Sequence, residues 1–368
     1  MPDFLRLIAA TDDMHELLVG ALSEHGVAHE ISGKIVTIGN DSPPERVIAL
    51  LRTILSGPER EAVSVVEELN FPHEFPVTTR LEAWWSVFET SWFEKAIAAS
   101  AFSIWFQPVV DTTARRIAGH ECLLRLTKGR RREGAEIMAA ASARRDLRAF
   151  DSYTRQLAIR AIAAQAPGDR AGMYFLNFIP SEIYRPSYCM RETMELLQET
   201  GLQPGNLVLE AVDSNCNPDI VHLRRIADYL REQGLGFALD DVGDNADALR
   251  LICELRPDYI KLESGLVNQL DQPCHATAVR RLVEVAERFS VRVIAKGVER
   301  VSTMEHLWDA GIQSMQGYLF GCPSPEVSGT EMDLSRLARA IRPQPDGAGY
   351  DEARNPEWQL ALASMGFD

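Results

Sequence analysis

The sequence predicts an α/β protein in which a small N-terminal α/β domain precedes a TIM-like (β/α)8 barrel. Two observations support this prediction. From residue 102 onward, eight short apolar runs rich in β-branched and aromatic residues alternate mostly with helical stretches. Ionisable or amide side chains recur near the ends of these runs, and a barrel brings its strand ends together at one mouth.

The N-terminal domain is expected to cover residues 1–69. Its patterns predict a strand at Phe4–Ala9, a helix from Met14 to Glu24, a hairpin across Ser32-Gly33, and one or two helices between Pro44 and Leu69. No pattern in this region indicates a binding or catalytic site.

Residues 70–92 are expected to hold a proline-containing linker and a connecting helix, the latter within an aromatic-rich helical pattern over Leu81–Ser100. The barrel is expected to span residues 93–342 and to be followed by a loose tail, residues 343–368. Its eight predicted strands are SIWFQPVV, IAGHECLLRL, GMYFLNFI, NLVLEAV, LGFALDD, YIKLES, VRVIAKGV and SMQGYLF. Helices are expected at 145–165, 219–234, 275–289 and 329–342.

Composition and charge narrow the function classes. The chain has 368 residues and a formal net charge of −15, which disfavours binding to a nucleic acid polymer, because such binding works by neutralising phosphates. A small phosphorylated ligand is still compatible. The six cysteines form no Cys-x-x-Cys pair, and no apolar run reaches membrane-spanning length. The sequence therefore predicts a cytoplasmic protein without a membrane anchor.

The run ends carry an unusual concentration of polar groups. Carboxylates gathered at one mouth repel each other unless metal ions or other cations lie among them, so the set predicts a site for a hard cation. The amide of Asn177 is a suitable neutral ligand. The full set is Glu121, Asn177, Glu210, Asp240, Asp241, Lys261, Glu263, Lys296, Glu299 and Gln316.

Eight segments resemble, in order and spacing, the motifs of EAL domains. They are FQPVVD (106–111), ECLLR (121–125), FLNFIP (175–180), LVLEAVDS (207–214), FALDDVGD (237–244), DYIKL (258–262), AKGVE (295–299) and QGYLFGCPSP (316–325). EAL domains are bacterial phosphodiesterase domains that open cyclic di-GMP to linear pGpG on a (β/α) barrel with Mg²⁺ or Mn²⁺. The resemblance covers roughly residues 93–342 and leaves residues 1–80 unexplained.

The resemblance implies roles for individual residues. The metal positions match Glu121, Asn177, Glu210, Asp240 and Asp241. Lys261 matches the lysine beside the attacking water and the phosphate, and Glu299 a further polar position of the pocket. The implied ligand contacts are Gln107, Arg125, Asp240 and Gln316. The resemblance thus implies cyclic di-GMP as partner and, by analogy, a homodimer.

One position departs from the family pattern in charge. Where the family has Ala-Glu-Gly-Val-Glu, this chain has Lys296 in place of the first glutamate. A protonated lysine cannot ligate a metal ion, and its charge repels one. We therefore expect one bound ion rather than two, or none, with Lys296 taking the place of the other.

Milder departures occur nearby. The usual Phe-Gly-Thr-Gly loop reads Val242-Gly243-Asp244-Asn245, Glu263 stands for aspartate, and Cys122 stands for alanine. Two interpretations follow. The first is a degenerate EAL domain that acts as a cyclic di-GMP effector or protein-interaction module with little or no hydrolysis. The second is a metal-dependent cyclic di-GMP phosphodiesterase producing pGpG, in which Glu263 or Glu299 compensates for the lost glutamate.

Overall fold

The computed structural model describes residues 5–39, 41–67, 77–128, 132, 134–144, 146–165, 172–212 and 219–329. The chain divides into two compact units. The N-terminal unit consists of Met1–Ser100 together with Ala135–Asp146, and the barrel unit consists of Ala101–Gly134 and Leu147–Asp368. The predicted helix at 329–342 and the tail 343–368 lie outside the described residues, apart from Gly329.

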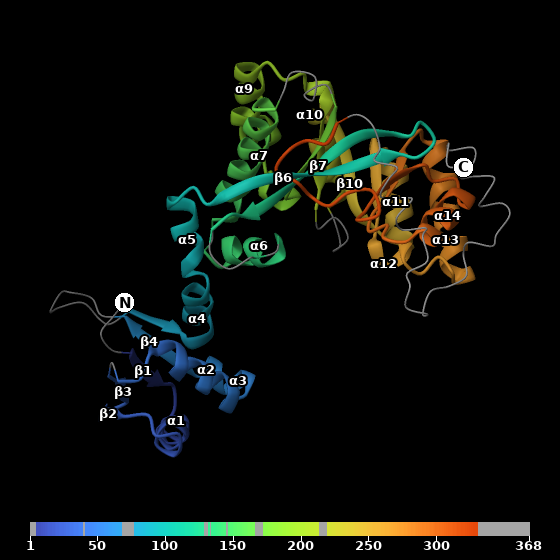
Figure 1. Cartoon of the computed structure of the whole chain (residues 1–368). Helices are drawn as coiled ribbons and strands as arrows, with labels where there is room; N and C mark the ends of the chain where they lie inside the picture. Colours follow the sequence, from blue (N-terminus) through green and yellow to red (C-terminus); the bar gives the residue numbers. More distant parts are fainter. Residues whose placement is uncertain are drawn as a thin grey trace, which may run out of the picture. The chain divides into compact units, whose positions relative to one another are not determined.

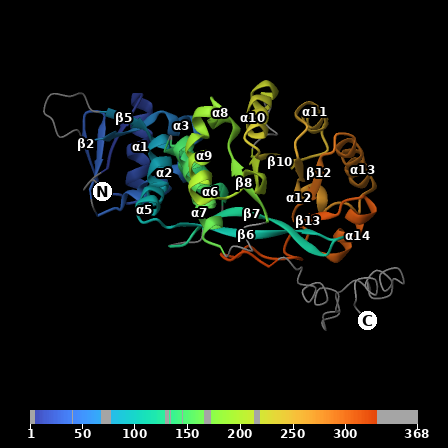
Figure 2. The same cartoon turned by 90° about the horizontal axis from the view of Figure 1, so that it is seen from above.

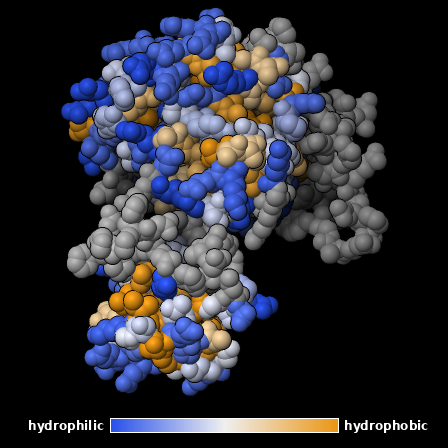
Figure 3. All heavy atoms as spheres, turned by 90° about the vertical axis from the view of Figure 1, so that its left-hand side faces the viewer, coloured by the Kyte–Doolittle hydropathy of each residue, from blue (hydrophilic) through white to orange (hydrophobic). Residues whose placement is uncertain are grey.

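The N-terminal unit is built on a five-stranded sheet in the order β2-β3-β1-β4-β5. Alternating buried residues of the central strand β1, including Leu5 and Leu7, pack with the buried residues of α1 and α2. Apolar side chains also remain at the surface of this unit (Figure 3), where Leu17 and Ile31 are both exposed. Its elements are β1 (Leu5–Ala9), α1 (Asp12–Glu24), β2 (His29–Ser32), β3 (Ile35–Ile38), α2 (Pro44–Ile54), α3 (Gly57–Glu61), β4 (Val63–Glu67), β5 (Val77–Arg80), α4 (Leu81–Glu89), α5 (Ser91–Ala98) and α6 (Gly134–Ala143).

Two predictions for this unit were wrong in detail. The segment expected to be helical up to Leu69 ends in the strand β4, because buried Val63 and Val65 alternate with Ser64 and pair with β1. The helical pattern over Leu81–Ser100 is split into α4 and α5 at Thr90, whose hydroxyl donates to the Ser86 carbonyl.

Helix α6 is inserted between strand β7 and helix α7 in the chain but belongs to the N-terminal unit. Arg144, which follows α6, forms an ion pair with Glu94 of α5. The Arg144 Nε also donates to the Thr90 hydroxyl over 3.2 Å. The chain thus leaves the barrel unit after β7, joins α5 through Arg144, and returns to the barrel at α7.

The barrel unit is a closed eight-stranded barrel in the order β10-β11-β12-β13-β6-β7-β8-β9, so the predicted TIM-like fold is confirmed. Helices lie around the strands (Figure 1). The strands are β6 (Phe102–Asp111), β7 (Arg116–Leu126), β8 (Met173–Phe178), β9 (Leu207–Ala211), β10 (Gly236–Val242), β11 (Tyr259–Leu262), β12 (Arg292–Ala295) and β13 (Ser314–Gln316). The α-helices are α7 (Leu147–Ala163), α8 (Pro186–Cys189), α9 (Arg191–Thr200), α10 (Ile220–Glu232), α11 (Ala246–Leu255), α12 (Ser264–Val267), α13 (Pro273–Arg288) and α14 (Val301–Asp309), with short 3-10 turns at Pro180–Glu182 and Pro204–Asn206.

Strand β6 runs antiparallel to both of its neighbours, β7 and β13, whereas the other neighbouring pairs are parallel. The cause is the tight turn after Asp111, whose carboxylate accepts hydrogen bonds from the backbone N–H groups of Thr113 and Ala114. Such a turn reverses the chain at once. β6 and β7 therefore form a long hairpin, and its two strands lie side by side in Figure 2.

Two apolar clusters hold the barrel together. The inner cluster takes one side chain from each of six strands, namely Val109, Phe175, Val208, Ala238, Tyr259 and Ile294. The larger outer cluster lies between the strands and the helices and includes Ile104 and Phe106 of β6. Within the described residues, no helix is long and apolar enough to cross a membrane.

Gly317 marks a place where two backbones approach closely near the mouth. A Cβ atom at this position would lie 2.0 Å from the carbonyl oxygen of Val298. We expect Gly317→Ala to lower the free energy of unfolding by about 1–3 kcal/mol or more, as forced overpacking does. Urea denaturation measures this loss. Gly205→Ala is the matched control, because no atom lies within 4 Å of its added Cβ, and equal losses in both variants would contradict the prediction.

Candidate functional site

The β6–β7 hairpin supplies the first wall of the site. Gln107 of β6 lies directly opposite Glu121 of β7, so both side chains project from the same face of the hairpin. The sequence pattern placed Glu121 at the end of its strand. In the structure β7 continues for five more residues, to Leu126. The hairpin therefore extends beyond the level of Glu121.

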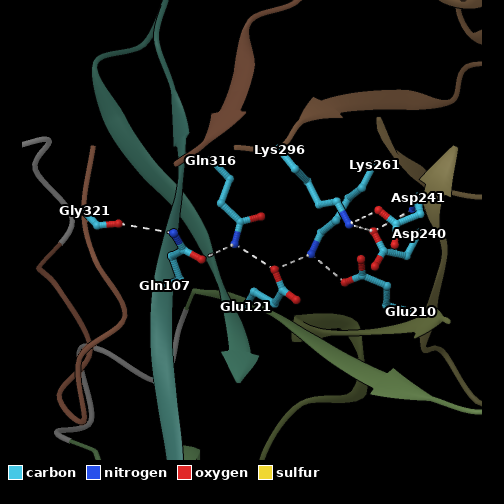
Figure 4. Close-up of polar contacts among 9 residues, drawn as sticks. All are labelled: Gln107, Glu121, Glu210, Asp240, Asp241, Lys261, Lys296, Gln316 and Gly321. Atoms are coloured by element: carbon cyan, nitrogen blue, oxygen red, sulfur yellow. Dashed lines mark hydrogen bonds and ion pairs between the residues drawn. The ribbon is translucent and has the colours of Figure 1, made fainter. Parts of the chain in front are cut away.

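A continuous line of polar contacts starts from this wall (Figure 4). The Gln107 amide donates to the carbonyl of Gly321 over 3.3 Å, and Gln316 Nε2 donates to Gln107 Oε1 over 3.3 Å. Gln316 Nε2 also donates to Glu121 Oε2 over 2.7 Å. These contacts fix the orientation of the Glu121 carboxylate.

Lys261 of β11 continues the line. Its ammonium lies 2.9 Å from Glu121 Oε2 and 2.6 Å from Glu210 Oε2 of β9. The Lys261 side chain is fully buried, with its ammonium 5.0 Å from the centre of the Phe175 ring. In this arrangement Lys261 joins two carboxylates and has no exposed surface for a ligand.

A second group of contacts forms at the end of β10. The register of β10 with β11 shifts between Leu239 and Val242, and Asp241 has a positive φ of 50°. Such a bulge redirects side chains. It places Asp240 and Asp241 so that the ammonium of Lys296 hydrogen-bonds both, with the contact to Asp241 Oδ1 at 2.7 Å (Figure 4).

Burial and the lysine charges set the protonation of the buried carboxyls. Burial alone would raise the pKa of Glu121, but the charges of Lys261 and Lys296 and the hydrogen bond from Gln316 lower it to about 2. Burial raises the pKa of Glu210 well above its usual value despite Lys261, with the charges of Glu121 and Asp240 adding to the effect. Glu210 is therefore the carboxyl of this pair that takes up a proton more readily.

The two ammonium groups are stabilised in their charged form. Burial disfavours the charge of Lys261, but Glu121, Glu210 and Asp240 together raise its pKa above the usual range. Asp240 and Asp241 likewise outweigh burial and raise the pKa of Lys296. In contrast, burial raises the pKa of the Cys122 thiol, which disfavours the reactive thiolate form.

Some buried oxygens of the site are donors of the kind that a divalent cation binds. Asn177 lies opposite Glu210 in the β8–β9 pair, and the buried Asn177 Oδ1 and Glu210 Oε1 have no hydrogen-bond partner in the described structure. Such buried oxygens suit a hard cation. However, no three His, Cys, Asp or Glu side chains of the described residues form a metal-binding group, and the Lys296 ammonium engages both Asp240 and Asp241.

Three other predicted site residues lie apart from this network. Arg125 is half-buried near the projecting end of β7 and donates to the Leu124 carbonyl over 2.9 Å. Glu299 is exposed and has no hydrogen bond or ion pair within the described part of the chain. Glu263 is also exposed, beside Gly243 and Gly265.

The sequence prediction did not include Phe175, whose ring lies against the Lys261 ammonium. The sequence carried a signal for this residue. Phe175 lies two residues before Asn177 in β8, so both side chains project from the same face of the sheet.

The family model of the EAL domain matches residues 90–323. This chain belongs to the EAL-domain family. The match takes in the whole hairpin wall, the β10 bulge and the loop that carries Lys296.

Curated relatives of this EAL protein include two named for cyclic di-GMP turnover. The probable cyclic di-GMP phosphodiesterase PdeG of Escherichia coli is 28% identical over 239 residues, which cover 63% of this chain and 46% of the relative. The bifunctional diguanylate cyclase/cyclic di-GMP phosphodiesterase MucR of Pseudomonas aeruginosa is 30% identical over 125 residues, covering 34% of this chain and 18% of the relative. The match thus spans less than half the length of either relative.

Solved EAL structures share the fold. A standalone EAL protein from Vibrio cholerae in its c-di-GMP-bound form has a TM-score of 0.54 at 25% identity, covering 62% of this chain and 95% of the other. The FimX EAL domain of Xanthomonas citri in complex with c-di-GMP reaches 0.59 at 19% identity, covering 68% and 99%. A calcium and cyclic di-GMP complex of BlrP1 from Klebsiella pneumoniae reaches 0.57 at 21% identity and covers 89% of this chain and 97% of the other.

Proposed function

We propose that this EAL domain binds cyclic di-GMP at the mouth of its barrel and hydrolyses it slowly or not at all, acting as an effector or protein-interaction module. The observation that carries the proposal is the Lys296 ammonium bonded to both Asp240 and Asp241. A fixed positive charge there repels a second divalent ion and attracts a phosphate. The c-di-GMP-bound forms of the Vibrio and Xanthomonas EAL domains support the ligand.

The charges of the mouth suit this role. Lys296 is partly exposed, unlike Lys261, and so offers its ammonium to a ligand phosphate from the rim. Arg125, farther along the hairpin, presents a guanidinium whose planar donors suit a second phosphate. This proposal includes a protein partner, either another protein or a second copy of this chain, that binds the ligand-bound form.

The second candidate function is a metal-dependent phosphodiesterase that forms pGpG. It is supported by the unpartnered oxygens of Asn177 and Glu210 and by relatives named as phosphodiesterases. One Mg²⁺ or Mn²⁺ would be held by Glu121, Asn177, Glu210 and Asp240, and it would supply Lewis-acid polarisation of a phosphate oxygen. Glu121 and Glu210 would first have to release Lys261, so we expect weak metal binding.

Hydrolysis and binding separate the two candidates. We expect cyclic di-GMP to bind the full chain with similar affinity in EDTA and in Mn²⁺, because Lys296 provides positive charge without a metal. Calorimetry measures the affinity, and chromatography follows pGpG under the same conditions. A turnover of about 1 s⁻¹ or more, a rate ordinary enzymes reach, would reject the effector role in favour of the phosphodiesterase.

A further inference from the structure

The face of the β6–β7 hairpin that carries Gln107 and Glu121 continues toward the open end of the hairpin. Trp105 lies opposite Leu123, one step beyond the Gln107–Glu121 pair, and Ser103 lies opposite Arg125 one step farther. Side chains two residues apart on a strand share a face, about 6–7 Å from each other. Trp105 therefore stands on the ligand side of the hairpin, between the Glu121 network and Arg125.

The other face of β6 has a different role. Ile104 and Phe106 are buried in the outer core cluster between the strands and the helices. Trp105 and Leu123 are only half-buried and belong to neither core cluster of the barrel. A large apolar side chain on the polar mouth face, left out of the core, is not explained by packing of the barrel.

Among the described residues, the contacts of the Trp105 ring differ from those of Trp308. Within the described residues it has no aromatic neighbour, no cation over its face and no hydrogen bond. By contrast, Trp308 donates its indole N–H to Thr112 Oγ1 over 2.7 Å. A partly exposed indole without an aromatic or cationic contact is a suitable stacking surface for a nucleobase.

We propose that Trp105 is the stacking platform for one purine base of the bound nucleotide, with Leu123 as its apolar neighbour. This assignment rests on the proposed function and names a subsite of the same mouth. If one phosphate of the dinucleotide lies near Lys296 and the other near Arg125, one of its bases lies over strands β6 and β7, between these two residues. A purine has a larger π-system than a pyrimidine and overlaps more of the indole. Trp105 therefore favours a purine base.

Calorimetry with cyclic di-GMP and with cyclic di-UMP tests the assignment on the full chain. Both probes carry the same cyclic phosphates and differ in the bases. Trp105→Leu is expected to weaken cyclic di-GMP binding about 5- to 150-fold, the range found when a stacked aromatic is removed. Cyclic di-UMP binding should fall much less, so the preference for the purine ligand shrinks. Unchanged cyclic di-GMP affinity in Trp105→Leu would overturn the assignment.

Tryptophan fluorescence gives a second measurement that does not depend on the folding of the leucine variant. Cyclic di-GMP should quench the wild-type emission, the quenching should disappear in Trp105→Phe, and it should persist in Trp308→Phe. Quenching retained in Trp105→Phe would refute stacking on Trp105. A wild-type protein without any heat of binding would refute the proposed function itself, whereas wild-type heat with an unaffected Trp105→Leu refutes only the stacking role.

Discussion

Replacing Lys296 by glutamate is expected to strengthen divalent metal binding and to raise cyclic di-GMP hydrolysis by about 10²–10⁴-fold, the usual contribution of a well-placed catalytic group. The variant removes an ammonium from Asp240 and Asp241 and adds an oxygen donor beside them. Both changes lower the electrostatic cost of placing a cation there. Mn²⁺ calorimetry and chromatographic detection of pGpG measure the two effects separately.

Lys296→Gln is the matched control, since it removes the charge and supplies no carboxylate. We expect it to relieve the repulsion of a metal ion but to recover less hydrolysis than Lys296→Glu. If Lys296→Glu bound metal yet stayed as inactive as the parent, the altered loop at Val242–Asn245 would become the better explanation for low activity.

Lys261→Met is expected to lower the free energy of unfolding by about 3–5 kcal/mol at neutral pH, the typical cost of removing one member of a buried ionic group. The change leaves the Glu121 and Glu210 carboxyls buried next to each other, without the ammonium that lies between them. Protonation of Glu210 would recover part of the loss. Urea denaturation followed by far-UV circular dichroism gives the difference.

Arg250→Ala is the exposed control for Lys261→Met. It tests whether the large expected loss of unfolding free energy depends on burial of the ionic group. Arg250 pairs with Glu254 over 2.8 Å on an exposed helix face, where solvent and salt screen an ion pair and leave it little net contribution to stability. We expect Arg250→Ala to unfold at nearly the same urea concentration as the parent. A Lys261→Met loss no greater than the Arg250→Ala loss would mean that the buried group contributes little to the stability of the barrel.

The sequence predicted the strands of the barrel well, because each run combines apolar content with β-forming residues. It did not predict the reversal of β6. The signal was available in the gap between the first two runs, residues 111–116, which is too short for the crossover of about a dozen residues that parallel strands need. The strand β4 was missed because its alternation is short and follows a helical pattern directly.

The polar residues of the mouth were readable from the sequence, but their pairing was not. Whether Lys261 faces a ligand or joins Glu121 to Glu210 depends on side-chain conformations and burial, which no spacing encodes. The bulge that turns Asp240 and Asp241 toward Lys296 is equally invisible, since a register shift is a property of two strands together. Glu299 illustrates the converse, because its motif position suggested a site role and its side chain is exposed.

The position of α6 in the chain decides how the protein can be dissected. A fragment beginning at Ala101 would retain α6 yet lack α5, and Arg144 would lose both Glu94 and Thr90. In such a fragment the Arg144 end of α6 would lose its polar contacts with α5, and we expect α6 to be less stable there. Replacing residues 135–146 by a short glycine-rich bridge should yield a better-behaved isolated barrel, and transplanting the N-terminal unit onto another protein would require two joins instead of one.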